Sequence, residues 1–587
     1  MDAAGHWFLD EHGRRLLLRG VNLGGSSKVP TTPPGATHFP TDFSEHRTAS
    51  FVGRPFSLAE ADEHFRRLRH WGFNCLRFLT TWEAIEHAGP GEYDEEYLGY
   101  LHEVVRRAGE YEFFIFIDPH QDVWSRMTGG DGAPGWTLEL VGFEPTRLDA
   151  SEAAITMQAR YPDYGQMVWP NNWGRLASAT MFTLFFGGEH LAPLLRVGDE
   201  SIQSYLQRHF IGALRQVAER MRGLPHVIGY DSLNEPSRGY LGIARLSDSL
   251  PVYGSAPQLT GFESMIVGSG FPVEVPLIEQ QGLVQRPAGR TTLNPAGHSA
   301  WHDSALDPWR MHGVWEVDAS GKPHLLQDGY FAGFEFFRDG VRPFARRYAE
   351  ALREVHPDAF LFIEGEPGAP EPLAWEDAPQ ERIVNASHWY DLLTLITKRY
   401  DPAACLVWGA PGETVTGVEA VRESFEEQIG AIVKESRREL QGVPTLIGEF
   451  GVPFDLNEKR SYRTEAFGAQ AAALARYYDA LDAHLAHGTL WNYTADNENE
   501  WGDGWNGEDL SIFSRSQQWN PYDLDSGGRA LEGFVRPYVR GCAGTPTRMR
   551  FDHQSGEFEL WVESEANEIP TELFVPRFQY QAGYEVE

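Results

Sequence analysis

The chain has 587 residues, 42% of them hydrophobic, which is enough for one large domain with insertions and a smaller appended domain. Its formal net charge of −34 argues against nucleic acid or anionic lipid heads as partners, because phosphate contacts need clustered lysine and arginine. A neutral small-molecule substrate fits this charge best.

Short, nearly continuous apolar runs recur along the chain, and each ends in polar residues. Runs of this length are typical of strands buried on both faces. The predicted strands are residues 16–24, 74–82, 113–122, 226–236, 360–367, 383–391, 444–451 and 488–496. Helical patterns lie between several of them, as at 58–71, 95–111 and 202–222. Eight strands alternating with helices predict a closed parallel (β/α)8 barrel, the TIM barrel.

A doubly wound open sheet is the structural alternative to the barrel. Such a sheet usually carries a glycine-rich, phosphate-binding turn after its first strand. Gly24-Gly25, which ends the first predicted strand, does not form that fingerprint. The barrel is therefore the favoured fold.

Two connections are too long to be simple loops, residues 123–201 and residues 237–340. Both leave the carboxyl ends of predicted strands, where barrel active sites are built, so we expect them to shape a pocket. Residues 549–562 alternate polar and apolar side chains around a glycine, which predicts a hairpin. We therefore predict a barrel with insertions over residues 1–535 and a small β-sandwich-like domain over residues 536–587.

The sequence contains no recognisable membrane, targeting or metal-binding signal. It has no apolar run of about 18 residues, and its first residues lack the basic and apolar regions of a signal peptide. Its three cysteines have no metal-binding spacing, and no HExxH motif supports His120-Gln121-Asp122 as a metal site. We expect a soluble, cytoplasmic protein that needs neither metal nor cofactor.

Two glutamates end predicted strands on opposite walls of the barrel. Glu235 lies in Asn-Glu-Pro at the end of the fourth strand, and Glu449 lies in Gly-Glu-Phe-Gly at the end of the seventh. Retaining hydrolysis of a glycosidic bond needs two carboxyls about 5–5.5 Å apart, one to protonate the leaving oxygen and one to attack the anomeric carbon. We therefore predict Glu235 as the acid/base and Glu449 as the nucleophile.

At these positions the sequence resembles glycoside hydrolase family 5, over roughly residues 7–535. The family places Arg on strand two, His on strand three, Asn-Glu on strand four, His and Tyr on strand six, Glu on strand seven and Trp on strand eight. The residues that match, in order, are Arg77, His120, Asn234, Glu235, His388, Tyr390, Glu449 and Trp491. The resemblance implies a retaining glycosidase on a TIM barrel.

The resemblance also implies roles for the residues around the glutamates. We expect Arg77 to keep Glu449 ionised and Tyr390 to donate a hydrogen bond to it. Asn234 is expected at the 2-hydroxyl of the sugar, a contact that strengthens in the transition state. For each single residue an ordinary structural role, such as a buried Arg–Glu pair, stays open.

The remaining matched residues are expected to hold the sugar. His120 and His388 would bind ring hydroxyls or neighbouring carboxylates. Trp491 would form the floor under the reacting sugar, because a flat ring covers the apolar face of a pyranose.

Several segments are similar to one branch of the family. Residues 20–30, 120–126 and 129–136 look like endoglycoceramidase-type enzymes, and residues 169–188 look more like fungal-type glucosylceramidases and steryl-β-glucosidases. Those enzymes carry a C-terminal β-sandwich, which residues 571–580 resemble, although the appendage here looks shorter. The branch implies further sugar contacts at Lys28, Asp122 and Trp173.

We expect hydrolysis, with retention, of a single glucose from a hydrophobic aglycone such as a ceramide, a sterol or a flavonoid-like aryl group. The apolar segment 179–188 favours an aglycone channel in the long loops, and a buried helix behind the barrel explains it equally well. Transient contact with lipid surfaces would accompany a lipid substrate.

Three alternatives stay open. An endoglycoceramidase would release a whole oligosaccharide and needs an open cleft on the sugar side. An enzyme whose main reaction is transglycosylation would need the same carboxyl pair. A non-catalytic carbohydrate- or lipid-binding protein is the alternative of another class, and the presence of both glutamates argues against it.

Overall fold

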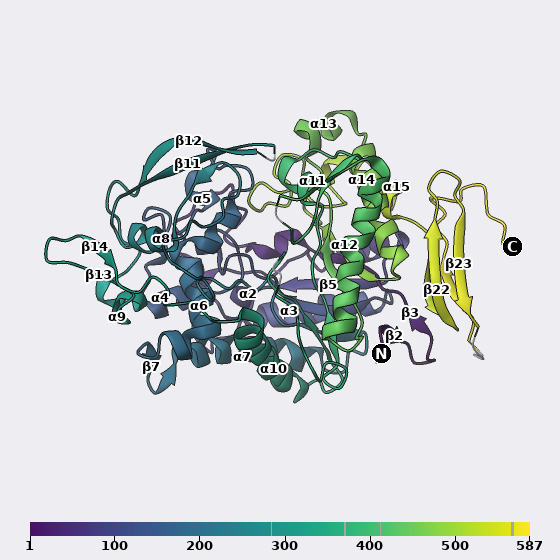
Figure 1. Cartoon of the computed structure of the whole chain (residues 1–587). Coiled ribbons are helices and arrows are strands. Elements are labelled where there is room, and N and C mark those ends of the chain that lie inside the picture. The colour runs from purple at the N-terminus through teal and green to yellow at the C-terminus, as the bar shows by residue number, and fades with distance from the viewer. Residues whose placement is uncertain (283, 369–370, 411, 565–568) are drawn as a thin grey trace.

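The structure is a computed structural model that describes the chain apart from residues 283, 369–370, 411 and 565–568. Its centre is a barrel of eight parallel strands with helices around it (Figure 1). The strands are β4 (Arg19–Leu23), β5 (Cys75–Thr80), β6 (Phe114–Pro119), β9 (Val227–Asp231), β15 (Phe360–Ile363), β16 (Ile383–Asn385), β19 (Leu446–Phe450) and β20 (His487–Tyr493). Seven of them fall within the apolar runs that the sequence predicts as strands, and the eighth, β20, begins one residue before its predicted run.

The barrel closes between β16 and β19. The other neighbours pair in parallel in the order β16, β15, β9, β6, β5, β4, β20, β19. A parallel bridge joins Asn385 to Thr445, and the Asn385 N–H donates to the Pro444 carbonyl at 3.0 Å. The prediction of a TIM barrel is confirmed, and the alternative of an open doubly wound sheet is wrong.

The barrel interior is packed with apolar side chains below the strand ends. The rings of Phe116 and Phe362 stack with centroids 4.1 Å apart. Phe8, from the N-terminal strand β2 (Trp7–Leu9), meets Phe360 edge-on at 5.4 Å. The interior and the amino-terminal end of the barrel are thus filled with apolar side chains. Polar side chains gather at the carboxyl ends of the strands, as is usual in this fold.

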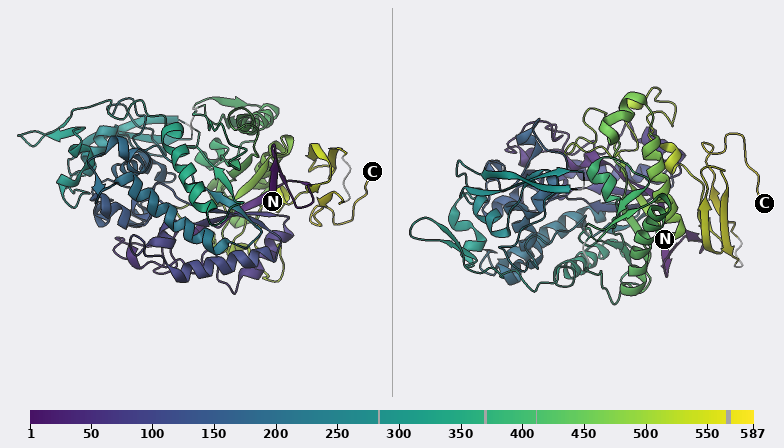
Figure 2. Two further views of the ribbon diagram at one scale, coloured as in Figure 1. Left: turned by 90° about the horizontal axis from the view of Figure 1, so that it is seen from below. Right: turned by 45° about the horizontal axis from the view of Figure 1, so that its top comes forward.

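Amphipathic helices cover the outside of the barrel, as both views in Figure 2 show. Three predicted helices are observed as α1 (Ala61–His70), α3 (Glu95–Gly109) and α7 (Ile202–Met221). Two of them begin at a side-chain cap: Asp94 accepts from the Tyr97 N–H, and Ser201 accepts from the Ser204 N–H. The outer ring continues with α10 (Arg342–Arg353), α12 (Val418–Glu439) and α14 (Gly468–Ala483).

The insertion after β6 contains the apolar segment of residues 179–188, and its structure decides between the two interpretations of that segment. It lies in helix α6 (Leu176–Leu191), whose residues are buried from Leu176 to Gly188. Its Phe185 ring packs against Phe344 of α10 with centroids 5.0 Å apart. The segment is thus a buried helix beside the barrel, and the prediction that it forms an aglycone channel is wrong.

The insertion after β9 forms a layer at one end of the molecule, at the left of Figure 1. It contains α8 (Gly261–Gly268), α9 (Pro308–Met311) and two hairpins. The hairpins are β11 (Val273–Gln281) with β12 (Val284–Leu293), and β13 (Trp315–Val317) with β14 (Pro323–Leu325). Because the insertion starts just after Glu235, its first residues lie beside the candidate site.

The C-terminal strands lie at the other end, at the right of Figure 1. β22 (Thr545–Phe551) and β23 (Phe558–Glu563) form the hairpin that the sequence predicts. β21 (Tyr538–Cys542) pairs with both β24 (Glu572–Phe574) and the N-terminal strand β3 (Arg15–Leu16), so the two chain ends share one sheet.

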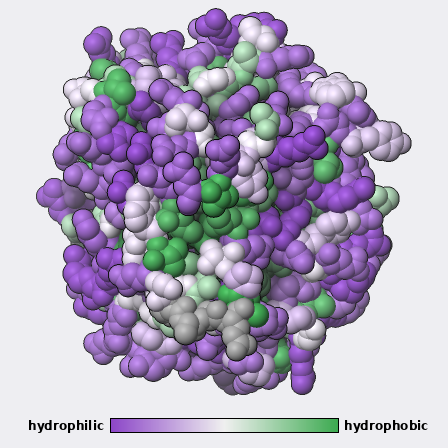
Figure 3. Space-filling model, turned by 90° about the vertical axis from the view of Figure 1, so that its right-hand side faces the viewer, coloured by the Kyte–Doolittle hydropathy of each residue, from purple (hydrophilic) through white to green (hydrophobic). Residues whose placement is uncertain are grey.

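The C-terminal strands carry exposed apolar side chains. Figure 3 faces this end and shows a hydrophobic area in the middle of a largely polar face. Trp561, Val562 and Leu573, of β23 and β24, are each about two-fifths exposed, at 39%, 39% and 42%. No helix in the described part of the chain is long and apolar enough to cross a membrane.

Candidate active site

A cavity of about 240 Å³ opens at the carboxyl ends of the barrel strands. Most of the site residues predicted from the sequence line it, namely Lys28, His120, Asp122, Trp173, Glu235, Tyr390, Glu449 and Trp491. The predicted residues Arg77, Asn234 and His388 stand behind this wall and contact the residues that form it. The structure therefore brings together side chains from six strand ends and two loops.

The two glutamates face each other across the cavity. One carboxylate oxygen of Glu235 and one of Glu449 lie within 4.8 Å of each other. His388 Nδ1 lies between them, 2.8 Å from Glu235 Oε1 and 3.6 Å from Glu449 Oε2. This separation is close to the value of about 5 Å that direct attack requires, and well below the roughly 6.5–9.5 Å of inverting enzymes.

Both oxygens of Glu449 have a donor. The Arg77 Nη1–H donates to Oε1 at 2.8 Å, and the Tyr390 hydroxyl donates to Oε2 at 2.8 Å. Gly448, the preceding residue, is needed here because a Cβ at that position would lie 2.9 Å from His388 Nε2. The carboxylate is thus fixed in orientation from two sides.

Arg77 is the centre of a fully buried cluster of charged groups. It lies within 3.1 Å of oxygens of four carboxyl groups, those of Asp118, Asp231, Glu364 and Glu449. Burial raises the pKa of Asp231 well above its ordinary value, and the neighbouring Glu364 raises it further. A protonated Asp231 reduces the negative charge that Arg77 must balance, as a buried ionic network requires.

Glu235 has the properties of an acid. Burial raises the pKa of its carboxyl group, the charge of Glu449 adds to this rise, and the His388 hydrogen bond opposes it. Its backbone is left-handed, with φ 36°, a strained conformation for a residue with a side chain. Two hydrogen bonds hold this conformation. The Glu235 N–H donates to the Glu364 carboxylate at 3.0 Å, and Gln121 Nε2 donates to the Glu235 carbonyl at 2.9 Å.

His388 connects the acid to the buried cluster. Its Nδ1 lies 2.8 Å from Glu235 Oε1, and its Nε2 lies 3.1 Å from Glu364 Oε1. Burial alone would lower the pKa of the imidazole, but Glu364 and Glu449 raise it well above its ordinary value. His388 therefore places a positive charge beside both candidate catalytic carboxyls.

The opposite wall is built on Lys28. Its Nζ donates to Asp122 Oδ2 at 2.6 Å and lies over the Trp505 ring at 3.8 Å and the Trp491 ring at 4.6 Å. His120 stacks on Trp491 with centroids 5.2 Å apart and planes 14° apart. Donors, acceptors and a flat aromatic surface thus face the same space.

One group of side chains in this wall has the composition of a metal site. Single ligand atoms of His120, Asp122 and Asp131 lie within 4.8 Å of one another, all buried. Lys28 already places an ammonium group on Asp122. Burial and the Asp122 charge raise the pKa of Asp131 well above its usual range, which favours a neutral carboxyl there. These residues fit a lysine-centred network better than a cation site.

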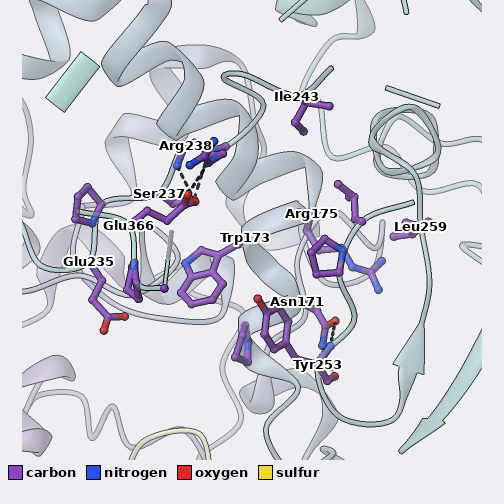
Figure 4. A pocket seen from close by; sticks show the side chains of 18 of the residues that line it. Asn171, Trp173, Arg175, Glu235, Ser237, Arg238, Ile243, Tyr253, Leu259 and Glu366 are labelled. Atoms are coloured by element: carbon purple, nitrogen blue, oxygen red, sulfur yellow. Dashed lines mark hydrogen bonds and ion pairs between the residues drawn. The ribbon is translucent and has the colours of Figure 1, made fainter. Parts of the chain in front are cut away.

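A second cavity, of about 440 Å³, adjoins the first (Figure 4). Trp173, Glu235 and Tyr253 line both cavities, so the acid stands where they meet. Its other walls are largely apolar, from Pro170, Ile243, Leu250, Pro251, Pro257 and Leu259. The two long insertions supply these residues, as the sequence predicts for loops that shape a pocket.

Sequence reasoning missed several residues of the site. Glu364 lies in the fifth predicted run and directly follows strand β15, so a carboxylate at this strand end was a signal that could have identified it. Trp505 and Glu508 lie in the loop after β20 and line the first cavity. Their segment has no periodicity and no motif that points to a role, so only the folded loop shows where they lie.

Comparisons with known proteins give two matches to family models. The model described as Cellulase (glycosyl hydrolase family 5) matches residues 35–242. The model described as Glycoside hydrolase family 5 C-terminal domain matches residues 536–587.

Individual relatives match over most of the chain. A glucosylceramidase of Rhizopus delemar is 36% identical, over 98% of this chain and 90% of its own. An ergosteryl-beta-glucosidase of Saccharomyces cerevisiae is 34% identical, over 86% of this chain and 74% of its own. A crystal structure of Cryptococcus neoformans sterylglucosidase 1 is similar with a TM-score of 0.90 and 31% identity, over 98% of this chain and 90% of that one.

Proposed function

The chain belongs to glycoside hydrolase family 5, as a glycosidase of the retaining type, and from this premise we propose that it releases one glucose from a β-glucoside with a hydrophobic aglycone. Relatives that match nearly the whole chain are named for glucosylceramide and for steryl glucosides, so we propose a ceramide or a sterol as the aglycone. The observation that carries the proposal is the position of Glu235, between a small cavity that holds the charged and aromatic residues expected to bind a sugar and a larger cavity whose walls come from the two long insertions.

In the first step Glu235 would act as the acid. Its raised pKa keeps the proton available until the glycosidic oxygen leaves towards the apolar cavity. Glu449, oriented by Arg77 and Tyr390, would attack the anomeric carbon and form a covalent glycosyl-enzyme. The separation of less than 4.8 Å between the carboxylate oxygens supports this direct attack.

In the second step the same groups would act in reverse. Once Glu449 is esterified, its negative charge disappears and the pKa of Glu235 falls, because that charge helps to raise it. Glu235 can then accept a proton from water, which attacks the anomeric carbon and releases Glu449. His388, paired with Glu364, holds the carboxyl of Glu235 in place throughout.

The sugar would lie in the 240 Å³ cavity. Trp491, with His120 stacked on it, offers a flat surface for the apolar face of the ring. Lys28 and Asp122 offer a charged donor and acceptor for hydroxyls beside it. Asn234 donates to the Gln121 carbonyl and accepts from Arg77, so its contact with the 2-hydroxyl would use the remaining amide hydrogen.

The aglycone would lie in the 440 Å³ cavity beyond Glu235. Apolar walls bind by removing surface from water, without demanding one stereochemistry. Because Ile243, Leu250 and Pro257 are half-buried and Pro251 is exposed in the free protein, a sterol or acyl chain would cover apolar surface that water now contacts. This favours a lipid leaving group over a second sugar.

Turnover of 4-nitrophenyl β-glucoside, glucosylceramide, a steryl glucoside and cellobiose tests the proposal. We expect activity on the first three and little on cellobiose. Replacing Glu449 with Gln should lower kcat on the aryl glucoside by at least about 10⁴-fold, because no nucleophile remains. Unchanged turnover in this variant would exclude the mechanism, and a preference for longer-headed glycolipids would favour an endoglycoceramidase.

A further inference from the structure

Glu508 is a carboxylate of the sugar cavity that the two-glutamate mechanism does not use. It lies in the loop after β20 and lines the cavity together with Lys28 and Asp122. The charges that act most strongly on it are those of Lys398, Lys28 and Asp122, not those of Glu235 or Glu449. Glu508 therefore belongs to the Lys28 side of the cavity, where Lys28 Nζ lies over the ring of Trp505 in the same loop.

The loop that carries Glu508 is tied to the insertion after β6. The Trp505 indole N–H donates to the Gly130 carbonyl at 3.2 Å, and Asn506 Nδ2 donates to the Gly129 carbonyl at 2.8 Å. The Glu508 N–H donates to the Trp505 carbonyl at 2.9 Å, which closes a turn. These bonds fix the backbone of Glu508 before any ligand binds.

One oxygen of Glu508 is held and the other is available. The Trp169 indole N–H donates to Oε1 at 2.8 Å. Among the residues that the structure describes, none donates a hydrogen bond to Oε2. A fixed carboxylate with an unsatisfied oxygen in a cavity is an acceptor for ligand hydroxyls. Burial raises the pKa of this carboxyl to about 7, which is the cost of leaving it without a strong partner.

Trp169 and Trp505 close the cavity around this carboxylate. Their rings meet at an angle of 64° with centroids 5.1 Å apart. Trp169 comes from the insertion after β6 and Trp505 from the loop after β20, so the contact joins the two loops across the Lys28 side. An oligosaccharide that extended past the first sugar on this side would have to displace them.

We infer that Glu508 is a specificity-determining residue that accepts hydrogen bonds from the 4- and 6-hydroxyls of the glucose, at the closed end of the sugar site. The inference rests on the proposed function, because Glu235 and Glu449 locate the anomeric carbon. In a glucopyranose C4 lies across the ring from C1, and C6 extends outward from the neighbouring C5, so the 4- and 6-hydroxyls both point away from the two glutamates. The equatorial 4-hydroxyl of glucose and its 6-hydroxyl can reach one carboxylate together, whereas the axial 4-hydroxyl of galactose turns away.

The variant Glu508→Gln tests this assignment, because its amide oxygen can still accept from Trp169. The substrates are aryl β-glucoside, aryl 6-deoxy-β-glucoside and aryl β-galactoside, assayed for kcat/KM. We expect the value for the glucoside to fall roughly 10- to 100-fold, as for a lost hydrogen bond to a charged group. The values for the other two sugars should fall less, because each of them has only one of the two hydroxyls in place to lose a bond, so the preference for glucose shrinks.

Two controls make the outcomes distinct. Glu366→Gln removes another cavity carboxylate, on the aglycone side beside Arg238, and should leave the ratios between the sugars unchanged. Thermal unfolding of Glu508→Gln should match the wild type. An equal loss on all three sugars would overturn the assignment of Glu508. A wild type inactive on every aryl β-glucoside would overturn the proposed function, and this inference with it.

Discussion

The two cavities that meet at Glu235 are built in different ways. The charged side chains of the sugar cavity are fixed by buried hydrogen bonds, as in the Lys28–Asp122 pair, and aromatic side chains and aliphatic ones such as Leu392 and Leu395 complete its walls. The aglycone cavity is lined mostly by apolar side chains, with one ion pair between Arg238 and Glu366. A polar ligand of defined stereochemistry needs directed partners, and a lipid needs only apolar area.

The chain positions of these residues follow the same division. The sugar cavity takes most of its charged residues from the ends of barrel strands, such as Glu449 in β19 and His120 directly after β6. The aglycone cavity takes its residues from the long insertions, such as Ile243 and Leu250. A packed barrel holds its strand ends rigidly, and loops vary more easily. We therefore expect changes on the sugar side to affect glucosides whatever their aglycone, and changes on the aglycone side to affect only lipid substrates.

The largest effect that separates the two sides is expected for Glu235→Gln, at their junction. A ceramide or steryl alcohol is a poor leaving group and needs protonation, whereas a nitrophenolate does not. We expect kcat/KM to fall about 10³- to 10⁴-fold for glucosylceramide and much less for 4-nitrophenyl β-glucoside. Equal losses on both substrates would show that Glu235 is not the acid.

A smaller and more general effect is expected for Lys28→Met, which keeps the length of the side chain and removes its charge. Asp122 would lose its cation, and the sugar would lose a donor. We expect kcat/KM to fall roughly 10- to 100-fold on aryl and lipid glucosides alike. A loss confined to lipid substrates would show that Lys28 contacts the aglycone, and it would contradict the assignment of its cavity to the sugar.

On the aglycone side Leu250→Ala should have a modest effect. Removing its methine and two methyl groups reduces the apolar area that a lipid can cover, and because the ligand covers only one side of this half-buried residue, the loss is equivalent to about one or two methylenes at about 0.8 kcal/mol each. We expect kcat/KM to fall roughly 3- to 10-fold for a steryl glucoside or glucosylceramide, while turnover of the aryl glucoside stays the same. Equal losses on the aryl substrate would argue that the cavity does not bind the aglycone.

The smallest expected effect is a shift of the pH profile. The acid must be protonated, so the alkaline limb of kcat/KM follows the pKa of Glu235, which burial raises. His388 opposes that rise, so His388→Asn should move the alkaline limb to higher pH, by on the order of one unit, as well as lowering the maximum. A limb that moves to lower pH would contradict this electrostatic arrangement.

Much of the fold was predictable because buried parallel strands produce continuous apolar runs, and turns at their ends expose polar residues. The same rule predicts Glu235 and Glu449 at the ends of two strands, and in the structure the two side chains line one cavity. Segment 179–188 shows a limit, since apolar composition does not distinguish a channel wall from the buried helix α6. Glu508 shows another, because its partner Trp169 lies 339 positions away in the chain and only folding joins them.

The proposed retaining mechanism depends most directly on Glu449, which becomes covalently bonded to the sugar. Incubation with an activated 2-deoxy-2-fluoro-β-glucoside, followed by peptide mapping by mass spectrometry, measures this. We predict a single fluoroglucosyl group on the peptide that contains Glu449, with loss of activity in proportion to labelling. Labelling of another carboxylate, or complete turnover of the probe to the α-anomer without any labelled protein, would contradict the account.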